Sequence, residues 1–149
     1  MASMFLLTYS APVRDLRIGD ELITQGTMGT DLFVLESGQL AVERDGVKIA
    51  TIDQADSLIG EMGLLLHRPH SATVRAETNS KVRVVADAMR VLERHPDITL
   101  RLASLLCHRL DETSGLVSEL SRKVSGAAEK TLVGRILSSL VTTPARRHG

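Results

Sequence analysis

The chain has 149 residues, a single cysteine, no tryptophan and only three aromatic side chains, and its 18 basic residues balance its 18 acidic ones. This length suits one domain with an aliphatic core that needs no disulfide or metal to fold. Because cysteine-ligated zinc and iron–sulfur sites need several thiolates, Cys107 alone excludes both, and it excludes an internal disulfide. We expect a reducing, cytoplasmic compartment.

The first residues and the charge distribution give further information about the class of protein. Residues 1–13 form the longest uncharged stretch, which falls well short of the ~18 apolar residues of a membrane span and lacks the basic start of a secretory signal. Residues 1–120 carry 12 basic and 17 acidic side chains, whereas residues 121–149 carry 6 and 1. A solvated basic helix is the ordinary cause of such a tail, and binding of nucleic acid or an acidic partner is the alternative.

Short apolar runs separated by glycines extend from Val13 to Val85 and predict a β meander. Asp45-Gly46 is the pair that a two-residue type I′ hairpin prefers, because both of its central residues have positive φ. Evenly spaced short strands with glycine turns are typical of a jelly roll, a barrel or a sandwich, and this length suits a small roll. We expect strands over residues 21–25, 32–36, 39–44, 47–52, 72–76 and 81–85.

After Val85 the apolar spacing changes from that of strands to that of helices. Residues 86–95 suit a short helix, and Pro96 with Asp97 is typical of the first turn of the next one. The apolar stripe that begins here continues for more than 25 residues. A helix of that length beside a small roll usually packs against a second helix, so we expect a parallel homodimer, with a helix folded back on its own roll as the alternative. The apolar positions recur every three or four residues at Ile98, Leu102, Leu105, Leu106, Leu110, Val117, Leu120 and Val124.

Two glycines and a second amphipathic stretch complete the helical part. Gly115 and Gly126 each cost a helix about 1 kcal/mol relative to alanine, so either is a candidate bend or end. Residues 132–141 form the second amphipathic stretch, and residues 144–149 are expected to form a frayed basic tail.

Residues 59–76, IGEMGLLLHRPHSATVRA, carry the groups with binding chemistry. Gly60 permits close approach of the backbone, and the N–H groups that follow it at the start of a turn or short helix can face an anion. Glu61 is an acceptor suited to a sugar hydroxyl, and Ser71 supplies a hydroxyl donor. Together these groups describe a pocket for a ribose joined to a phosphate.

This segment resembles the phosphate-binding cassette of the cyclic nucleotide-binding domain family, written roughly F/I-G-E-x-A/G-L, a spacer, then P-R-S/A-A-T-V. The resemblance extends over GDELITQG at 19–26, LFVLESG at 32–38 and HPDI at 95–98, followed by RL at 109–110. It implies a mainly β fold, an eight-stranded β-roll or double-stranded jelly roll followed by a short helix and a long helix. The binding domain would span 1–125, with the roll at 12–85 and helices at 86–125, and a helical extension with its basic tail would span 126–149. The helix that precedes the roll in the family is reduced here to residues 1–9.

The resemblance also implies the ligand, cyclic AMP with cyclic GMP as the alternative, and it implies neither a metal nor another cofactor. By position, Gly60 would give a backbone N–H to the nucleotide and Glu61 would accept the ribose 2′-hydroxyl. Ser71 and Ala72 would meet the cyclic phosphate. The remaining candidates within the cassette are Met62, His70 and Thr73.

His70 departs from the family pattern, because it stands where the family has the arginine that clamps the phosphate. An arginine is always charged and offers a fork of donors, whereas an imidazole offers one donor and is mostly neutral at pH 7. Since a charge-assisted hydrogen bond contributes ~1.5–3 kcal/mol, the replacement weakens phosphate binding by roughly 10- to 150-fold unless the ring is protonated. Arg75 should face the opposite side of its strand from Val74, whereas Arg68 lies in the spacer and can swing in.

Residues 109–117, RLDETSGLV, and 134–140, GRILSSL, resemble helices of the cyclic-AMP receptor family of bacterial transcription regulators. In that family a Thr-Ser pair on the dimer helix contacts the adenine, which adds Thr113 and Ser114 to the candidate site. Such side chains otherwise bond back to the preceding helical turn. The spacing from Ser114 to Gly134 is about two helical turns longer than in those regulators. Only eight residues follow Val141, so we expect no DNA-reading helix-turn-helix in this chain.

Three alternatives remain open. His67, His70 and Glu61 lie close enough in sequence for a cupin-type metal enzyme, although the H-x-H pattern of cupins is missing. A redox or haem sensor would need more than Cys107, whose apolar neighbours are typical of a core residue. The third alternative is a ligand-free dimerisation module that has lost nucleotide binding through His70. We expect a regulatory sensor domain rather than an enzyme, in which nucleotide binding rearranges the helices after Val85.

Overall fold

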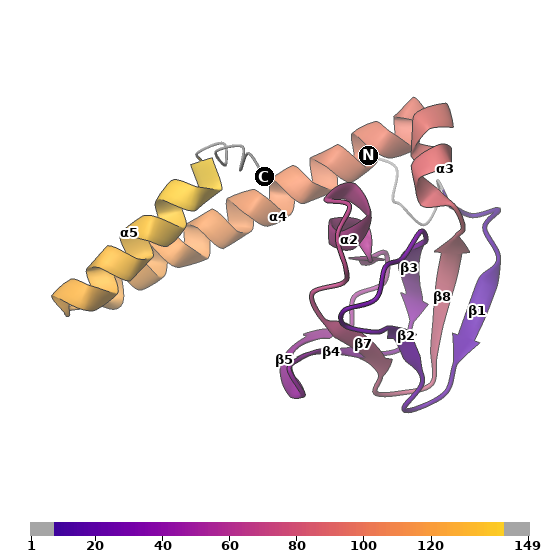
Figure 1. Ribbon diagram of the computed structural model, residues 1–149, viewed down its shortest axis with the longest axis horizontal. Coiled ribbons are helices and arrows are strands. Elements are labelled where there is room, and N and C mark those ends of the chain that lie inside the picture. The colour runs from indigo at the N-terminus through magenta and orange to yellow at the C-terminus, as the bar shows by residue number, and fades with distance from the viewer. Residues whose placement is uncertain (1–7, 142–149) are drawn as a thin grey trace. The chain divides into compact units, whose positions relative to one another are not determined.

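The computed structural model describes residues 8–141, which contain eight strands and four helices. The chain consists of two compact units, residues 1–101 and residues 102–149. The first unit holds all eight strands, two short helices and the beginning of the long helix (Figure 1). The predicted fold class, a β-roll followed by a short and a long helix, is therefore confirmed.

The roll consists of two four-stranded antiparallel sheets whose inward side chains share one aliphatic core. In the first sheet the order is β1-β8-β3-β6, formed by Val13–Leu16, Ser80–Val85, Leu32–Ser37 and Leu58–Ile59. In the second sheet the order is β2-β7-β4-β5, formed by Glu21–Ile23, Thr73–Ala76, Leu40–Arg44 and Val47–Ile52. Alternate residues of a strand face the same side, so each strand contributes its inward positions to the core. The deepest of these side chains, exposed by 2% or less, include Leu16, Leu35, Leu40 and Val82.

The β4–β5 hairpin confirms the turn predicted at Asp45-Gly46. Both residues have positive φ, 52° at Asp45 and 78° at Gly46, as a type I′ turn requires. Arg44 pairs with Val47 across the turn. β5 is one of the two edge strands of its sheet, and the side chains of Val47 and Ile49 are 63% and 58% exposed.

β1 and β6 lie outside the predicted strands. In β1 only Leu16 is buried, so the sequence Val-Arg-Asp-Leu has no alternation of apolar and polar residues to reveal a strand. β6 has only two residues. Both strands are specified by their partners, since β1 pairs along β8 and β6 pairs along β3. Pairing between distant segments leaves little local signal in a sequence.

Three helices begin in the first unit. The short helix allowed for after Gly60 is α2, Glu61–Leu65. The one predicted over residues 86–95 is α3, Ala88–Arg94, and the helix start predicted at Pro96 is confirmed by α4, Pro96–Lys123. The hydroxyl of Thr99 donates to the carbonyl of Leu92, which joins the first turn of α4 to α3.

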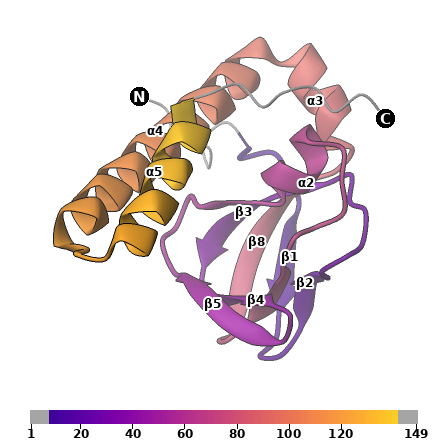
Figure 2. The ribbon, with the colours of Figure 1, turned by 60° about the vertical axis from the view of Figure 1, so that its left-hand side comes forward.

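In the second unit, the remainder of α4 and α5, Ala127–Val141, run side by side (Figures 1 and 2). Gly126 lies at the break between the two helices, whereas Gly115 lies within α4 and does not end that helix. Val133 of α5 is 4% exposed. Cys107 is exposed, so the expectation that it is a core residue is wrong. It lies five positions after the buried Leu102, roughly 140° around the helix, and therefore on another face.

Two predictions fall on residues that the structure does not describe, the basic tail at 144–149 and most of the reduced N-terminal helix at 1–9. The predicted functional division at residues 125 and 126 stays a prediction.

Candidate functional site

The cassette connects β6 to β7 and contains α2. Gly60, the residue before α2, has a φ of 94°, a conformation that residues with a side chain rarely adopt. A Cβ added there would lie 3.2 Å from the carbonyl oxygen of Asp31 and 3.3 Å from Cδ1 of Ile23. The backbone at Gly60 is therefore packed closely against the segment that leads into β3, whereas its approach to a nucleotide stays a prediction.

Glu61 is the first residue of α2 and is only 4% exposed, although a carboxylate is rarely buried without compensation. The next residue, Met62, is 47% exposed. The two candidate side chains of this helical turn thus differ in exposure, since the Glu61 carboxylate is buried and the Met62 thioether lies at the surface.

The imidazole of His70 lies between two glycines. A Cβ added at Gly29, in the loop between β2 and β3, would lie 2.4 Å from Nε2 of His70. A Cβ added at Gly63, in α2, would lie 3.0 Å from Nδ1 of the same ring. Burial of the ring lowers the pKa of His70, which favours the neutral form.

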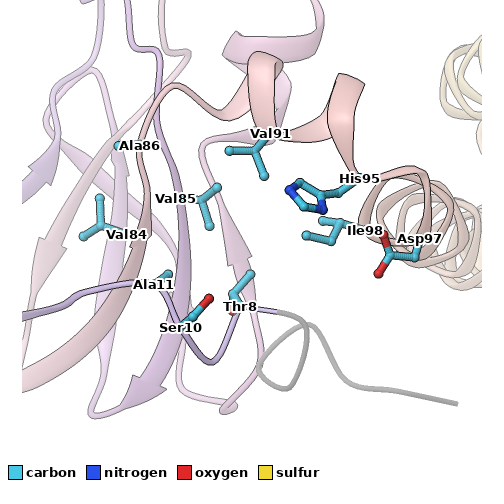
Figure 3. Close-up of a pocket in the computed structure, with 10 residues that line it drawn as sticks. All are labelled: Thr8, Ser10, Ala11, Val84, Val85, Ala86, Val91, His95, Asp97 and Ile98. Atoms are coloured by element: carbon cyan, nitrogen blue, oxygen red, sulfur yellow. The ribbon is translucent and has the colours of Figure 1, made fainter.

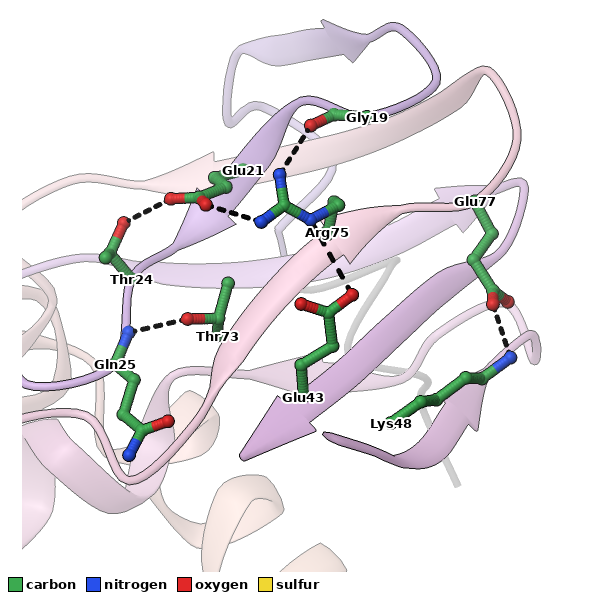
Figure 4. A network of polar contacts seen from close by, with 9 residues as sticks. All are labelled: Gly19, Glu21, Thr24, Gln25, Glu43, Lys48, Thr73, Arg75 and Glu77. Atoms are coloured by element: carbon green, nitrogen blue, oxygen red, sulfur yellow. Dashed lines mark hydrogen bonds and ion pairs between the residues drawn. The ribbon is translucent and has the colours of Figure 1, made fainter. Parts of the chain in front are cut away.

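The three residues after His70 have different surroundings. Ser71 is exposed, and its hydroxyl has no hydrogen-bond partner among the described residues. Ala72 is half-buried. The hydroxyl of Thr73 accepts a hydrogen bond from the backbone N–H of Gln25 at 2.9 Å and keeps its own proton to donate (Figure 4). Ser71 is therefore the more exposed of the two hydroxyls, and Thr73 stays a candidate donor.

Arg75 lies on the outer face of the second sheet, opposite Val74, as predicted from strand alternation (Figure 4). Its guanidinium pairs with Glu21 at 2.6 Å and with Glu43 at 3.6 Å. The Thr24 hydroxyl and, secondarily, this guanidinium lower the pKa of Glu21. Because Arg75 is held by these carboxylates, it does not replace the cation missing at position 70.

Two positions that the sequence analysis did not single out hold the cassette and its neighbours together. Gln25 exchanges two hydrogen bonds with Asp45 in the β4–β5 turn, through Nε2 to Oδ1 at 2.8 Å and from the Asp45 backbone N–H to Oε1 at 2.9 Å. Gly29 provides the space for the His70 ring. Both contacts join residues 20 or more positions apart, so no local spacing could have revealed them.

Thr113 and Ser114 lie in the helical unit. Their hydroxyls donate to the carbonyls of Arg109 and Leu110, each at 2.7 Å, which is the backbone-directed arrangement weighed against an adenine contact. Their part in a nucleotide site stays a prediction, and so does the reach of Arg68, which is exposed in the spacer.

A cavity of about 350 Å³ lies elsewhere in the first unit, where the chain before β1 meets the end of β8, α3 and the start of α4 (Figure 3). Its lining is mixed, with apolar side chains such as Val85, Val91 and Ile98. The polar groups are those of Thr8, Ser10, His95 and Asp97. None of its lining residues belongs to the cassette.

Within residues 8–141, no three His, Cys, Asp or Glu side chains come together in a way that could hold a metal ion. No described helix is long and apolar enough to span a membrane.

The sequence model of the cyclic nucleotide-binding domain matches residues 13–92, which is more than half of the chain. The chain therefore belongs to the cyclic nucleotide-binding domain family, as the cassette predicted.

Relatives narrow the type of domain. The cAMP-activated global transcriptional regulator CRP of Salmonella typhimurium is 31% identical over 128 residues, which cover 80% of this chain and 57% of the regulator. An uncharacterised ABC transporter ATP-binding protein of Mycobacterium tuberculosis is 32% identical over 99 residues, which cover 63% of this chain and 29% of the relative. The chain thus spans only part of these relatives. The catabolite activator protein of Thermus thermophilus superposes with a TM-score of 0.61 at 22% identity, over 93% of this chain and 80% of that protein. The fold is a CRP-like cyclic-nucleotide-binding β-roll.

Proposed function

We propose that the cassette between Gly60 and Thr73 binds a cyclic nucleotide, with cyclic AMP preferred to cyclic GMP, and that the chain acts as a regulatory sensor without catalysis. The observation that carries this proposal is the joint placement of three groups in one short segment. Gly60 brings the backbone close at the start of α2, Glu61 is held buried beside it, and Ser71 presents an unpaired hydroxyl. Ribose and cyclic phosphate need an acceptor and donors of these kinds.

Each group then has a defined role in the bound state. The Glu61 carboxylate accepts the ribose 2′-hydroxyl, and the backbone N–H groups at Gly60 and Met62 approach the nucleotide. Ser71 and Ala72 contact the cyclic phosphate. We favour cyclic AMP over cyclic GMP because two relatives respond to it by name. One is the cAMP-activated regulator of Salmonella. The other is a cAMP-dependent protein kinase type II regulatory subunit of Drosophila melanogaster, which is 39% identical over 66 residues, or 44% of this chain and 17% of the subunit.

Isothermal titration calorimetry with cyclic AMP and cyclic GMP tests the proposal. We expect cyclic AMP to bind more tightly, and Glu61→Gln to weaken it by about 10- to 150-fold, since a hydrogen bond to a charged group contributes ~1.5–3 kcal/mol. Glu93→Gln, at an exposed carboxylate of α3, serves as the control and should leave the affinity unchanged. Absence of both heat and a thermal shift at millimolar nucleotide would favour a ligand-free dimerisation module instead.

We further propose that nucleotide binding shifts the arrangement of the helices after β8. This is supported by chain order, since β7 and β8 lead from the cassette directly into α3 and α4. In such a population shift, affinity and helix arrangement are linked. Hydrogen exchange of α3 and α4 should change on addition of cyclic AMP, and identical exchange with and without nucleotide rules the coupling out. Loss of affinity in Thr113→Ala or Ser114→Ala would support adenine contacts by these residues.

The long helix is proposed to pair with a second copy of the chain. Within the helical unit Leu110, Leu116 and Leu120 of α4 are 44%, 66% and 50% exposed, which is a large apolar surface for a solvated helix. Light scattering coupled to size exclusion should report a dimer, and Leu116→Glu combined with Leu120→Glu should give a monomer. A monomeric parent protein would support the alternative of a helix folded back on its own roll.

A further inference from the structure

The two glycines beside His70 are required for space rather than for backbone conformation. Neither Gly29 nor Gly63 is among the glycines with positive φ, so an alanine could adopt either backbone conformation. At Gly29 the obstacle is the imidazole, whose Nε2 lies 2.4 Å from the position of a Cβ. At Gly63 the Nδ1 of the same ring lies 3.0 Å from that position, and the backbone carbonyl oxygen of Arg68 lies 3.1 Å from it. Real Cβ contacts are essentially never shorter than 3.0 Å, so an alanine at position 29 forces either the ring or the loop that carries residue 29 to move.

Backbone hydrogen bonds hold the loop that contains Gly29 next to His70. The N–H of Gly26 donates to the carbonyl of His70, and the N–H of His70 donates to the carbonyl of Thr27, each at 2.9 Å. The ring therefore lies where residues 26–31 meet α2. The same loop reaches the other end of the cassette, because the carbonyl of Asp31 lies against Gly60.

The ring has the properties of a packing group in this place. It is partly buried, and burial lowers its pKa, so the neutral imidazole is the favoured form in the free protein. A neutral planar ring can fill a slot between two glycines at little desolvation cost, whereas a guanidinium cannot leave water without a counter-charge.

We propose that His70 is a positioning residue whose imidazole, seated between Gly29 and Gly63, fixes residues 26–31 against α2 and thereby preorganises the cassette. The position at which the family places a phosphate cation is used in this chain, in the free state, to hold a loop. The consequence for nucleotide affinity rests on the proposed function, whereas the consequence for the loop does not. Preorganisation increases affinity because the free protein has less freedom to lose on binding.

A double-mutant cycle with Gly29→Ala and His70→Ala tests this directly. In the nucleotide-free protein, Gly29→Ala should raise hydrogen-exchange rates in residues 26–31 by about tenfold, because the loop opens more readily without the seated ring. In the His70→Ala background the same substitution should change these rates by less than about twofold, since the obstacle is already gone. Gly134→Ala is the control, because a Cβ at Gly134 meets no atom within 4 Å and should leave the loop unaffected.

Affinity for cyclic AMP is measured on the same four proteins. Gly29→Ala should weaken it by about fivefold in the parent and not in the His70→Ala background. Equal effects of Gly29→Ala on loop exchange in both backgrounds would overturn the contact between ring and loop. Coupled loop exchange with unchanged affinity would overturn the positioning role and leave a purely structural one. If the parent binds neither cyclic nucleotide, the proposed function fails, while the exchange cycle still decides whether His70 holds the loop.

Discussion

Replacing Gly60 by alanine tests the geometry at the start of the cassette. The φ of 94° costs a residue with a side chain about 1–2 kcal/mol. The new Cβ would also lie 3.2 Å from the Asp31 carbonyl oxygen and 3.3 Å from Cδ1 of the buried Ile23, and crowding of this kind in a packed region adds about 1–3 kcal/mol. We therefore expect Gly60→Ala to lower the free energy of unfolding by about 2–5 kcal/mol.

Gly46→Ala is the matched control, because Gly46 also has positive φ, 78°, but a Cβ there meets no atom within 4 Å. It should cost only the conformational part, about 1–2 kcal/mol. Urea denaturation of both variants isolates the contact part as their difference, provided that the m-values stay equal. In thermal unfolding each kcal/mol corresponds to about 2–4 °C for a chain of this size. If Gly60→Ala destabilises no more than Gly46→Ala, the close packing of the cassette against Asp31 and Ile23 is refuted.

Three further predictions concern His70, Arg83 and Gln25. Burial lowers the pKa of His70 in the free protein, whereas a nearby phosphate favours the protonated ring. If the ring leaves its place between Gly29 and Gly63 in the bound state and contacts the phosphate, binding takes up a proton, so affinity should rise from pH 8 to pH 6 and His70→Arg should tighten binding at pH 8. Calorimetry showing neither effect would place the imidazole away from the phosphate. Arg83→Leu removes hydrogen bonds to the Tyr9 and Ala11 carbonyls and an ion pair with Glu36 from a side chain that is 10% exposed. It should lower the free energy of unfolding in urea by about 2–4 kcal/mol, and a loss below about 1 kcal/mol would contradict this account. Gln25→Ala removes both hydrogen bonds to the β4–β5 turn, so amide exchange at the turn should accelerate and the free energy of unfolding should fall by about 1 kcal/mol. Unchanged exchange would show that the turn is stable without the Gln25 side chain.

The parts of the fold that could be predicted are those with a local cause. Asp45-Gly46 determined the hairpin because its two residues tolerate positive φ, and the predicted strand 47–52 coincides with β5. Pro96 marked the start of α4 because proline suits the first helical turn. β1 and β6 could not be predicted, since their register comes from β8 and β3. Cys107 was misjudged because apolar neighbours in sequence do not share one face of a helix.

In the candidate site, too, features with a local cause could be predicted and features set by distant residues could not. The glycine, carboxylate and hydroxyl of the cassette could be proposed as candidates because they are consecutive or close in sequence. The surroundings of His70 could not, because Gly29 is 41 positions away and only the fold brings it to the ring. The same is true of Thr73, whose hydroxyl accepts a hydrogen bond from the backbone N–H of Gln25, 48 positions away. The sequence therefore indicates which groups of the cassette are candidates for binding, and the structure shows which distant residues contact the cassette.

The outer position of β5 affects how the protein behaves at high concentration. The backbone of an edge strand with exposed apolar side chains, here Val47 and Ile49, is a template on which a second chain can add a strand. A register shift between Val42 and Glu43 disturbs the neighbouring ladder, and Lys48 places a charge on the strand between the two apolar residues. A neutral substitution at Lys48 would remove that charge and favour aggregation through this edge, even in a protein whose nucleotide site is intact.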